Sequence, residues 1–178
     1  SVEASIIEQY VSQDDAKYWR NYVSEVFLQK YSRLSIYKTQ QESLSAYHTH
    51  FRVVAQSESS LLNTFTYDAG SKLARSDLNV KLMGKQAATN NHGLYLSRNS
   101  QHVDNHIDIH HDIEETFSKM FYKGVLNDDS RAVFNGGVRV LKDAQKVGSE
   151  QKNANLLLSK NCEIDTKPEL EIYADDVR

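Results

Sequence analysis

The sequence is poor in the residues that usually make turns and covalent cross-links. Its 178 residues include one proline, Pro168, one cysteine, Cys162, and seven glycines. A conventional β-sandwich uses more glycine and proline at its turns than this. A single cysteine excludes an internal disulfide framework, and it excludes any all-cysteine cluster or zinc site within one chain. A reducing, cytosolic compartment therefore fits the sequence best.

Charge and hydropathy exclude two further classes of protein. The net charge is −3 and the sequence pI is near 6.1, with the positive charges scattered, so nucleic acid is not an expected partner. No apolar run approaches the ~20 residues that span a bilayer. The N-terminus, "SVEASIIEQYVSQDD", has no basic region followed by an apolar stretch, so no signal peptide is visible. We therefore expect neither nucleic acid nor a membrane as the partner.

Most of the chain consists of short segments in which apolar and polar residues alternate, which is typical of strands. Only two short segments are helix candidates, Asp14–Trp19 and Ser71–Leu78, and neither sustains the helical period of about 3.6 residues. The sequence therefore predicts an all-β fold with little helix. Examples of the alternating segments are "LSIYKTQ", "LLNTFTYD", "GLYLS", "AVFNGGVRV" and "ELEIYA".

A repeat of 27 residues runs through the N-terminal half, with units that start at Val26, Val53 and Val80. Each unit has an apolar strand, a polar turn and a second strand. A period between about 20 and 50 residues indicates stacked repeats that bury their apolar faces against one another. The alternative is an antiparallel sandwich whose spacing coincides by chance. The scarcity of glycine and proline favours a β-helix with polar corners, so we predict a single β-helix core domain over residues 1–178.

Both ends of the sequence lie in strand-like segments, "ASIIEQYV" and "LEIYADDVR". Solenoids need polar caps for solubility, and neither end supplies one. We therefore expect the chain to be part of something longer, or to meet a partner at an end.

A set of motifs then occurs in order along the chain. The pieces are "YKG" at 122–124, "VFNG" at 133–136, "DAQK" at 143–146, "NLLLS" at 155–159 and "DTKPELEIYADDV" at 165–177, with "QQES", "DLNV", "GLYL" and "QHVDNH" upstream. On these motifs the chain resembles the SufB/SufD family of iron–sulfur cluster assembly proteins, and the SufD branch in particular. The resemblance covers nearly the whole chain.

The resemblance implies a right-handed parallel β-helix core and a non-catalytic scaffold role. The implied partners are a SufB-like scaffold protein or a second copy of the chain, and a SufC-like ATPase. Family members continue into a Cys-x-His-Gly motif and a helical domain that docks the ATPase, and they have an N-terminal helical region. None of these parts has a matching position in residues 1–178. The resemblance therefore implies no cofactor on this chain, because the iron–sulfur cluster is handled by the whole complex.

The stretch "QHVDNHIDIHHDIEE" holds four of the seven histidines. On a strand its residues divide between two faces, and the apolar set must face the core. We therefore predict that Ile107 and Ile109 are buried and that His102 and His106 are exposed. Neighbours on the outer face lie about 6.5–7 Å apart, so His102, Asp104 and His106 are candidate zinc or iron ligands. The alternatives are a solvated face whose charges satisfy one another and a partner-binding surface. The complete outer set is His102, Asp104, His106, Asp108 and His110.

The other candidate residues suggest no chemistry. His48 and His50 share a strand face without an acidic neighbour and are interpreted as surface residues. His92, in "NNHG", and "NGG" at Asn135–Gly137 are interpreted as turns, and Cys162 as a cysteine without a role in a polar turn. The sequence has no glycine-rich phosphate loop, no Gly-x-Ser-x-Gly and no His-Glu-x-x-His. We expect no catalytic residues. The alternative is a β-helical metal-dependent or carbohydrate-active enzyme that uses the His102–His110 face.

The C-terminal segment "ELEIYADDVR" is the predicted partner interface. It alternates inward and outward residues, and an unpaired strand edge recruits another chain. We expect a two-fold dimer that pairs strands near Glu169–Val177. The predicted interface consists of Leu170, Ile172 and Ala174 on the inner side and Glu169, Glu171 and Tyr173 on the outer side.

Overall fold

The computed structural model describes residues 2–177, and its regular elements are all β-strands. These are β1 (Glu3–Val11), β2 (Trp19–Leu28), β3 (Arg33–Gln41), β4 (Tyr47–Gln56), β5 (Leu61–Asp68), β6 (Leu73–Leu82), β7 (Ala88–Ser97), β8 (His102–His111), β9 (Phe117–Leu126), β10 (Arg131–Val140), β11 (Gly148–Leu157) and β12 (Glu163–Ile172). The all-β prediction is confirmed. The two helix candidates are wrong: Asp14–Trp19 is an irregular loop that enters β2, and Ser71–Leu78 is a bend followed by the first residues of β6. Within the described residues no helix is long and apolar enough to cross a membrane.

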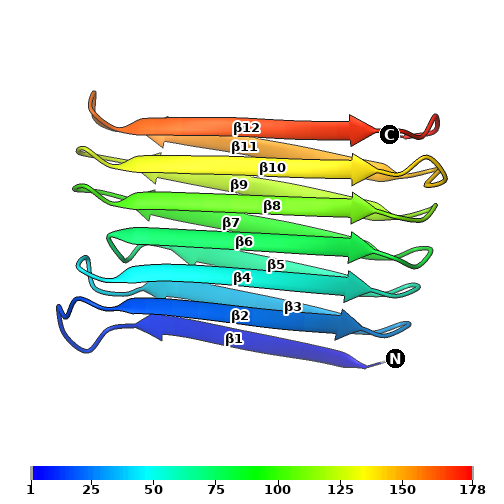
Figure 1. The fold of residues 1–178 in the computed structure, drawn as a ribbon, viewed down its shortest axis with the longest axis horizontal. Helices are drawn as coiled ribbons and strands as arrows, with labels where there is room; N and C mark the ends of the chain where they lie inside the picture. Colours follow the sequence, from blue (N-terminus) through cyan, green and yellow to red (C-terminus); the bar gives the residue numbers. More distant parts are fainter. Residues whose placement is uncertain (1, 178) are drawn as a thin grey trace.

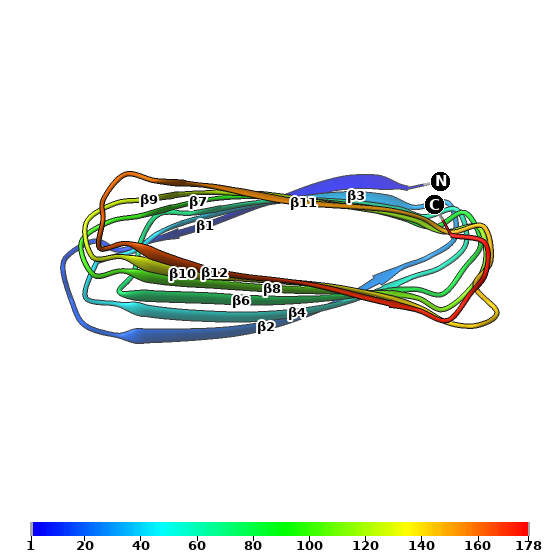
Figure 2. The same ribbon diagram turned by 90° about the horizontal axis from the view of Figure 1, so that it is seen from above.

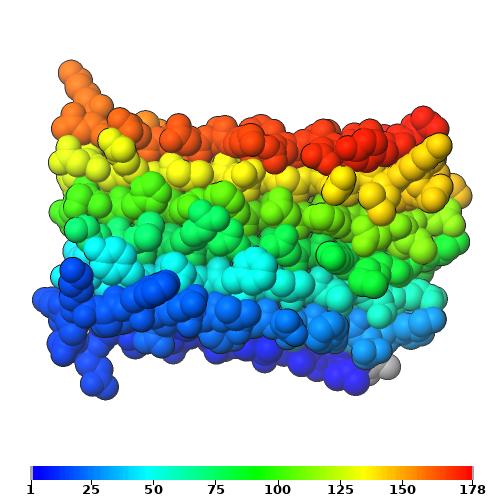
Figure 3. All heavy atoms as spheres, in the orientation of Figure 1, coloured from blue at the N-terminus to red at the C-terminus, as the bar shows by residue number. Residues whose placement is uncertain are grey.

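The strands form two six-stranded parallel sheets, one in the order β1-β3-β5-β7-β9-β11 and the other in the order β12-β10-β8-β6-β4-β2. The chain alternates between the sheets, so each coil adds one strand to each (Figure 1). Seen from above, the two sheets face one another across a flat interior, and successive coils superimpose (Figure 2). The coils rise as a right-handed β-helix, as the family resemblance implied. Figure 3 shows them stacked in sequence order from the N-terminal to the C-terminal coil.

The register supports the repeat and corrects its alignment by one residue. Val26 pairs with Val54, and Val54 pairs with Val80. The predicted repeat member Val53 instead pairs with Asn79 and lies on the opposite face of the sheet from Val54. The coils vary in length because their turns differ, so a strict period of 27 residues cannot hold the register.

Non-glycine residues in the left-handed backbone region build the corners. Eight such residues have φ between 54° and 61°, all in turns between strands, whereas none of the described glycines has positive φ. At one corner the backbone amides are stacked from coil to coil: the Ser59 amide donates to the Lys85 carbonyl at 2.9 Å, and the Gln86 amide donates to the Glu115 carbonyl at 2.9 Å. The hydrogen bonds between coils offset the cost of the strained backbone, which is about 1–3 kcal/mol for each residue. Such corners explain how the chain turns with so little glycine and proline. The eight residues are Tyr31, Ser59, Ser71, Gln86, Asn99, Glu115, Asp128 and Lys146.

The interior changes character along the axis. In the C-terminal coils it is largely apolar, with Phe134, Val138 and Val140 buried beside Leu126. Two buried tyrosines pack over inward-facing glycines there, and a Cβ placed on Gly93 would lie 2.1 Å from the Tyr122 ring. In the N-terminal coils, by contrast, the inward positions are mostly polar or charged. They include Lys38, Gln40, His48, His50, Arg52, Thr64 and Asp68, all of them buried.

Candidate functional site

The face of β8 that carries the histidines points outward, as predicted. Ile107 and Ile109 are 2% and 1% exposed, so the predicted parity is confirmed. His102 and His106, however, are half-buried rather than exposed. The outer face is more crowded than the sequence indicated because parallel strands flank β8 on both sides. His106, for example, lies in register between Asp77 of β6 and Asn135 of β10.

Asp104 is engaged by neighbouring side chains on this face. The Arg75 guanidinium donates through Nη1 to Asp104 Oδ2 at 2.6 Å, and it forms a fork with Asp77 at 2.8 and 2.9 Å. His106 Nε2 lies 2.8 Å from Asp104 Oδ1, an ion-pair distance without hydrogen-bond alignment. His102 opens the strand, in register with Leu73. Among residues 2–177 no group of three His, Cys, Asp or Glu side chains is placed to hold a metal ion. The geometry supports mutual satisfaction of these charges, and a metal at His102, Asp104 and His106 stays an untested prediction.

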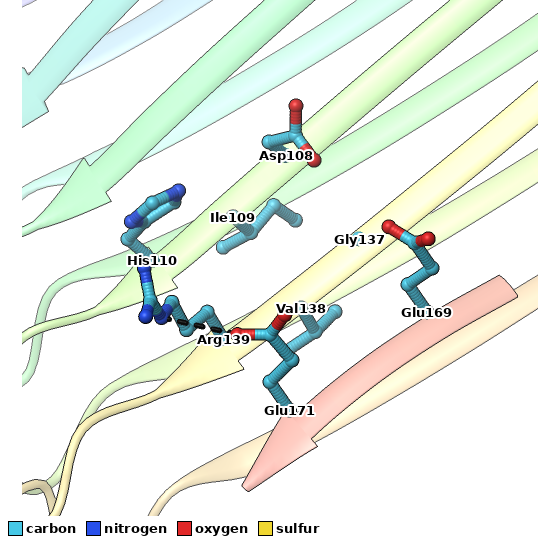
Figure 4. Close-up of a pocket in the computed structure, with 8 residues that line it drawn as sticks. All are labelled: Asp108, Ile109, His110, Gly137, Val138, Arg139, Glu169 and Glu171. Carbon is cyan, nitrogen blue, oxygen red and sulfur yellow. Dashed lines mark ion pairs between the residues drawn. The ribbon is translucent and has the colours of Figure 1, made fainter.

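An acidic hollow of about 260 Å³ lies further along the same face, where β8, β10 and β12 run side by side (Figure 4). In register across the three strands, Gly137 lies between Asp108 and Glu169. Because Gly137 has no side chain, the carboxylate of Asp108 leans over it, and a Cβ there would lie 2.5 Å from Asp108 Oδ1. The "NGG" segment is thus in the middle of β10, and its interpretation as a turn is wrong. The missing side chain of Gly137 leaves space for the hollow on the outer surface.

Carboxylates outnumber cations in this acidic hollow. Burial raises the pKa of Asp108, and the nearby charge of Glu169 adds to the effect, while His110 opposes it. The guanidinium of Arg139 is 3.2 Å from Glu171 and so is already paired. A positively charged group that entered the hollow would relieve the repulsion between the carboxylates, so the arrangement suits a cationic side chain from a partner.

The predicted interface on β12 has the expected inward and outward parity. Leu170 and Ile172 pair with Val138 and Val140, which are buried at 3% and 0% exposure. Leu170 and Ile172, in contrast, are 63% and 43% exposed. They point along the same inner face, but among residues 2–177 no strand pairs with the far side of β12. The rest of the predicted set comprises Tyr173, which is exposed, Ala174, which packs against the core, and Glu169 and Glu171, which line the acidic hollow. The apolar residues of β12 therefore form an open edge beside that hollow.

The interpretation of His48 and His50 as surface residues is wrong, because both point into the coil and are buried. His48 Nδ1 lies 2.6 Å from Glu42 Oε2, so an acidic neighbour is present after all. Glu42 also accepts hydrogen bonds from Tyr18 at 2.9 Å and from Arg20 at 2.7 Å. This buried cluster was missed because the outward residues of β4 are more apolar than the inward ones, which inverts the usual pattern. Val54 pairs with the core residue Val80. This pairing shows that Val54 faces the interior, and His48 and His50 lie on the same face of β4 as Val54.

The interior histidines stay neutral. Burial, together with the nearby charge of Lys38, lowers the pKa of His48 to about 4 and that of His50 to about 2. Burial would by itself raise the pKa of Glu42, but its hydrogen bonds, of which that from Arg20 is the strongest, hold it below its usual value. A further buried histidine, His111, bonds through both ring nitrogens to hydroxyls of Thr116 and Ser118 at 2.8 and 2.9 Å, and burial lowers its pKa to about 4.

Two other sequence interpretations need correction. His92 is not in a turn: it lies on the exposed face of β7, edge-on to Phe121 with ring centroids 6.2 Å apart. Cys162 immediately precedes β12 and is buried, with its sulfur 3.2 Å from the Ser159 carbonyl oxygen. It packs in the core rather than in a solvated turn, and nothing around it indicates a chemical role.

Comparisons with known proteins agree with this architecture. The family described as "SUF system FeS cluster assembly, SufBD core domain" matches residues 1–178. "Protein ABCI7, chloroplastic" of Arabidopsis thaliana is 33% identical over 178 residues, which are 99% of this chain and 38% of the relative. "Iron-sulfur cluster assembly protein SufD" of Escherichia coli is 28% identical over 176 residues, 99% of this chain and 42% of the relative.

A third relative, "Iron-sulfur cluster assembly SufBD family protein slr0076" of Synechocystis, is 30% identical over 161 residues, 90% of this chain and 36% of the relative. The chain thus spans about two-fifths of the length of the curated relatives that it matches. With a family match over its whole length and a parallel β-helix fold, this chain belongs to the SufBD core family of the SUF iron–sulfur cluster assembly system.

Proposed function

We propose that this chain is the β-helix core of a SufD-type scaffold protein, which takes part in iron–sulfur cluster assembly without catalysing a reaction itself. A relative that carries the SufD name and matches 99% of the chain supports the SufD branch. The observation that carries the scaffold role is the open edge of β12, where Leu170 and Ile172 continue a buried apolar ladder but stay exposed. An apolar strand edge of this kind recruits a further strand, and we propose that a partner supplies it.

The proposed partner is a SufB-like protein that adds backbone hydrogen bonds to β12 and covers its apolar residues. The acidic hollow lies next to this edge, so a lysine or arginine of the partner can pair there with Asp108 and Glu169. The interface then combines an apolar centre with a charged rim, which is the usual arrangement at protein–protein contacts. A second copy of the chain would use the same edge in a homodimer.

Other parts of the proposal rest on the family alone. A SufC-like ATPase is the proposed third component, bound through regions outside residues 1–178. We propose that the iron–sulfur cluster is the cargo of the whole complex rather than a cofactor of this chain, and that the complex acts in the cytosol. No observation on the His102–His110 face favours an enzyme, since Asp104 is engaged by Arg75 and His106.

Binding to a purified SufB-like partner tests the proposal, with the protein at its full natural length. Ile172→Lys places a charge in the apolar edge, and we expect it to weaken binding at least tenfold. Tyr37→Lys is the matched control, because Tyr37 is 46% exposed on the outer face of the other sheet. Equal affinity for the unchanged protein and the Ile172→Lys variant would place the partner elsewhere.

A further inference from the structure

A small cavity lies in the interior of the β-helix, between the two sheets. Its volume is about 20 Å³, and inward-facing residues of β3, β4, β5, β6, β8 and β9 contribute to its lining. A cavity needs roughly 10–15 Å³ of this kind of volume to hold one water molecule. The space therefore accepts one water-sized or monoatomic ligand, and an organic molecule is too large for it.

The lining includes three side chains that donate hydrogen bonds, Lys38, Arg52 and Asn105, beside hydroxyl groups that can donate or accept. Asn105 is 2% exposed, and its Nδ2 has no hydrogen-bond partner within the described residues. The Lys38 ammonium, also in the lining, donates to Ser76 Oγ at 2.7 Å and lies 3.2 Å from Asp68 Oδ1. Because an ammonium has three N–H groups, one more can be donated. The unpartnered amide is costly in a dry interior, so the cavity needs an acceptor.

Arg52 adds a second cation to the lining. It donates through Nε to Ser24 at 2.8 Å and through Nη2 to Glu8 at 2.5 Å, which leaves Nη1 for another acceptor. The carboxylates that pair with the two cations, Asp68 and Glu8, are not part of the lining. The lining therefore includes the cations of two ion pairs but not the carboxylates that pair with them.

Two other residues of the lining agree with a positive local potential. The one carboxylate residue there, Asp77, belongs to the outer face of β6, where the Arg75 fork holds its oxygens at 2.8 and 2.9 Å. Burial, followed by the charges of Lys38 and Arg52, lowers the pKa of His50 to about 2, so the imidazole is neutral and adds no positive charge of its own.

We propose that this cavity binds one small inorganic anion of halide size, held by Lys38, Arg52 and the Asn105 amide. The ion would bridge the two sheets, because Lys38 comes from β3 and the other two residues come from β4 and β8. It would also supply the acceptor that Asn105 lacks. This inference concerns the interior of the coil and is independent of the proposed function at the β12 edge.

Crystals of the protein soaked in sodium bromide test the proposal through the anomalous scattering of bromide. We expect one anomalous peak inside the coil, within hydrogen-bond distance of Asn105 Nδ2 and Lys38 Nζ. A water molecule at that position without anomalous signal, or an empty cavity, would overturn the proposal. This experiment uses the unchanged protein, so it does not depend on the folding of any variant.

Melting temperatures in potassium bromide and potassium gluconate at equal ionic strength provide the solution test, because gluconate is too large to enter. We expect the unchanged protein to melt at a higher temperature in bromide. Asn105→Leu should abolish the difference between the two salts. Asn79→Leu, the same change on the outer face of β6, should keep it. A difference that persists in Asn105→Leu would show that bromide acts elsewhere.

Discussion

Ile107 and His106 are neighbours on β8 that face opposite sides of the sheet, and truncating them should have different effects. Ile107 is 2% exposed, so Ile107→Ala leaves a cavity and should lower the free energy of unfolding by about 2–5 kcal/mol. His106→Ala removes a partly solvated ion pair with Asp104, so it should change the free energy of unfolding by less than about 1 kcal/mol. Urea denaturation of both variants measures the contrast, and similar losses would contradict the assigned parity.

Gly93 allows Tyr122 to cross the interior, so its replacement should be costly although it adds one methyl group. A Cβ on Gly93 would lie 2.1 Å from the Tyr122 ring, which is itself 3% exposed and cannot move outward. We expect Gly93→Ala to cost about 1–3 kcal/mol by overpacking. Adding Tyr122→Leu to Gly93→Ala should cost less than the two single changes summed. Additive losses in this double-mutant cycle would show that the contact is not the cause.

At the scale of the strand, we expect the unpaired edge of β12 to determine whether the isolated chain self-associates. Its Leu170 and Ile172 are exposed, and its far edge is unpaired within residues 2–177. We predict a dimer at micromolar concentration for residues 1–178 alone, observed by light scattering. Ile172→Lys should return it to a monomer, because a lysine ammonium is not buried without a partner. A monomeric unchanged chain, or a dimer that survives this change, would contradict pairing through β12.

The strands themselves could be predicted from the sequence, whereas their register and several of their faces could not. Alternation of apolar and polar residues locates most strands, and on β8 the apolar set does face inward. On β4 the same rule fails, because ion pairs and hydrogen bonds stabilise His48 and Arg52 in the interior. Whether a polar side chain has a buried partner depends on residues one coil away, which local alternation does not contain.

The acidic hollow illustrates the same limit at the candidate site. Both regions that border it were identified from the sequence, the histidine-rich strand and the C-terminal strand. Their meeting at Gly137 depends on parallel pairing of β8, β10 and β12, and "NGG" in isolation resembles a turn. Parallel neighbours on both sides override the turn propensity of two adjacent glycines, and the missing side chain then becomes a surface hollow.

Over the whole molecule, the buried charges divide the β-helix into two kinds of interior. The N-terminal coils hold Glu42, Lys38 and Asp68 inside, while the C-terminal coils hold mainly aliphatic and aromatic side chains. Polar interiors are stable only while every partner keeps its protonation state, because an unpaired buried charge is expensive. The stability of the whole chain should therefore depend on pH through a few interior groups.

Three buried histidines set the direction of that dependence. The pKa is lowered to about 4 in His48 and His111 and to about 2 in His50, against about 6.5 in an unfolded chain. At a pH between the folded and unfolded pKa values, these histidines are protonated in the unfolded chain and neutral in the folded chain. The free energy of unfolding is therefore highest above about pH 6.5, and it decreases as the pH falls toward the pKa values of the folded chain. From pH 7.5 to 5.5 we expect a loss of about 1.4 kcal/mol for each histidine.

Urea unfolding at the two pH values measures this loss, and one substitution isolates a single proton. His111→Gln removes one titrating group, so the difference in unfolding free energy between pH 7.5 and 5.5 should shrink by about 1.4 kcal/mol. His92→Gln removes an exposed imidazole on the outer face of β7 and should leave the difference unchanged. Equal pH dependence in His111→Gln and the unchanged chain would mean that His111 titrates alike in both states. His111 would then not be one of the interior groups that couple folding to pH.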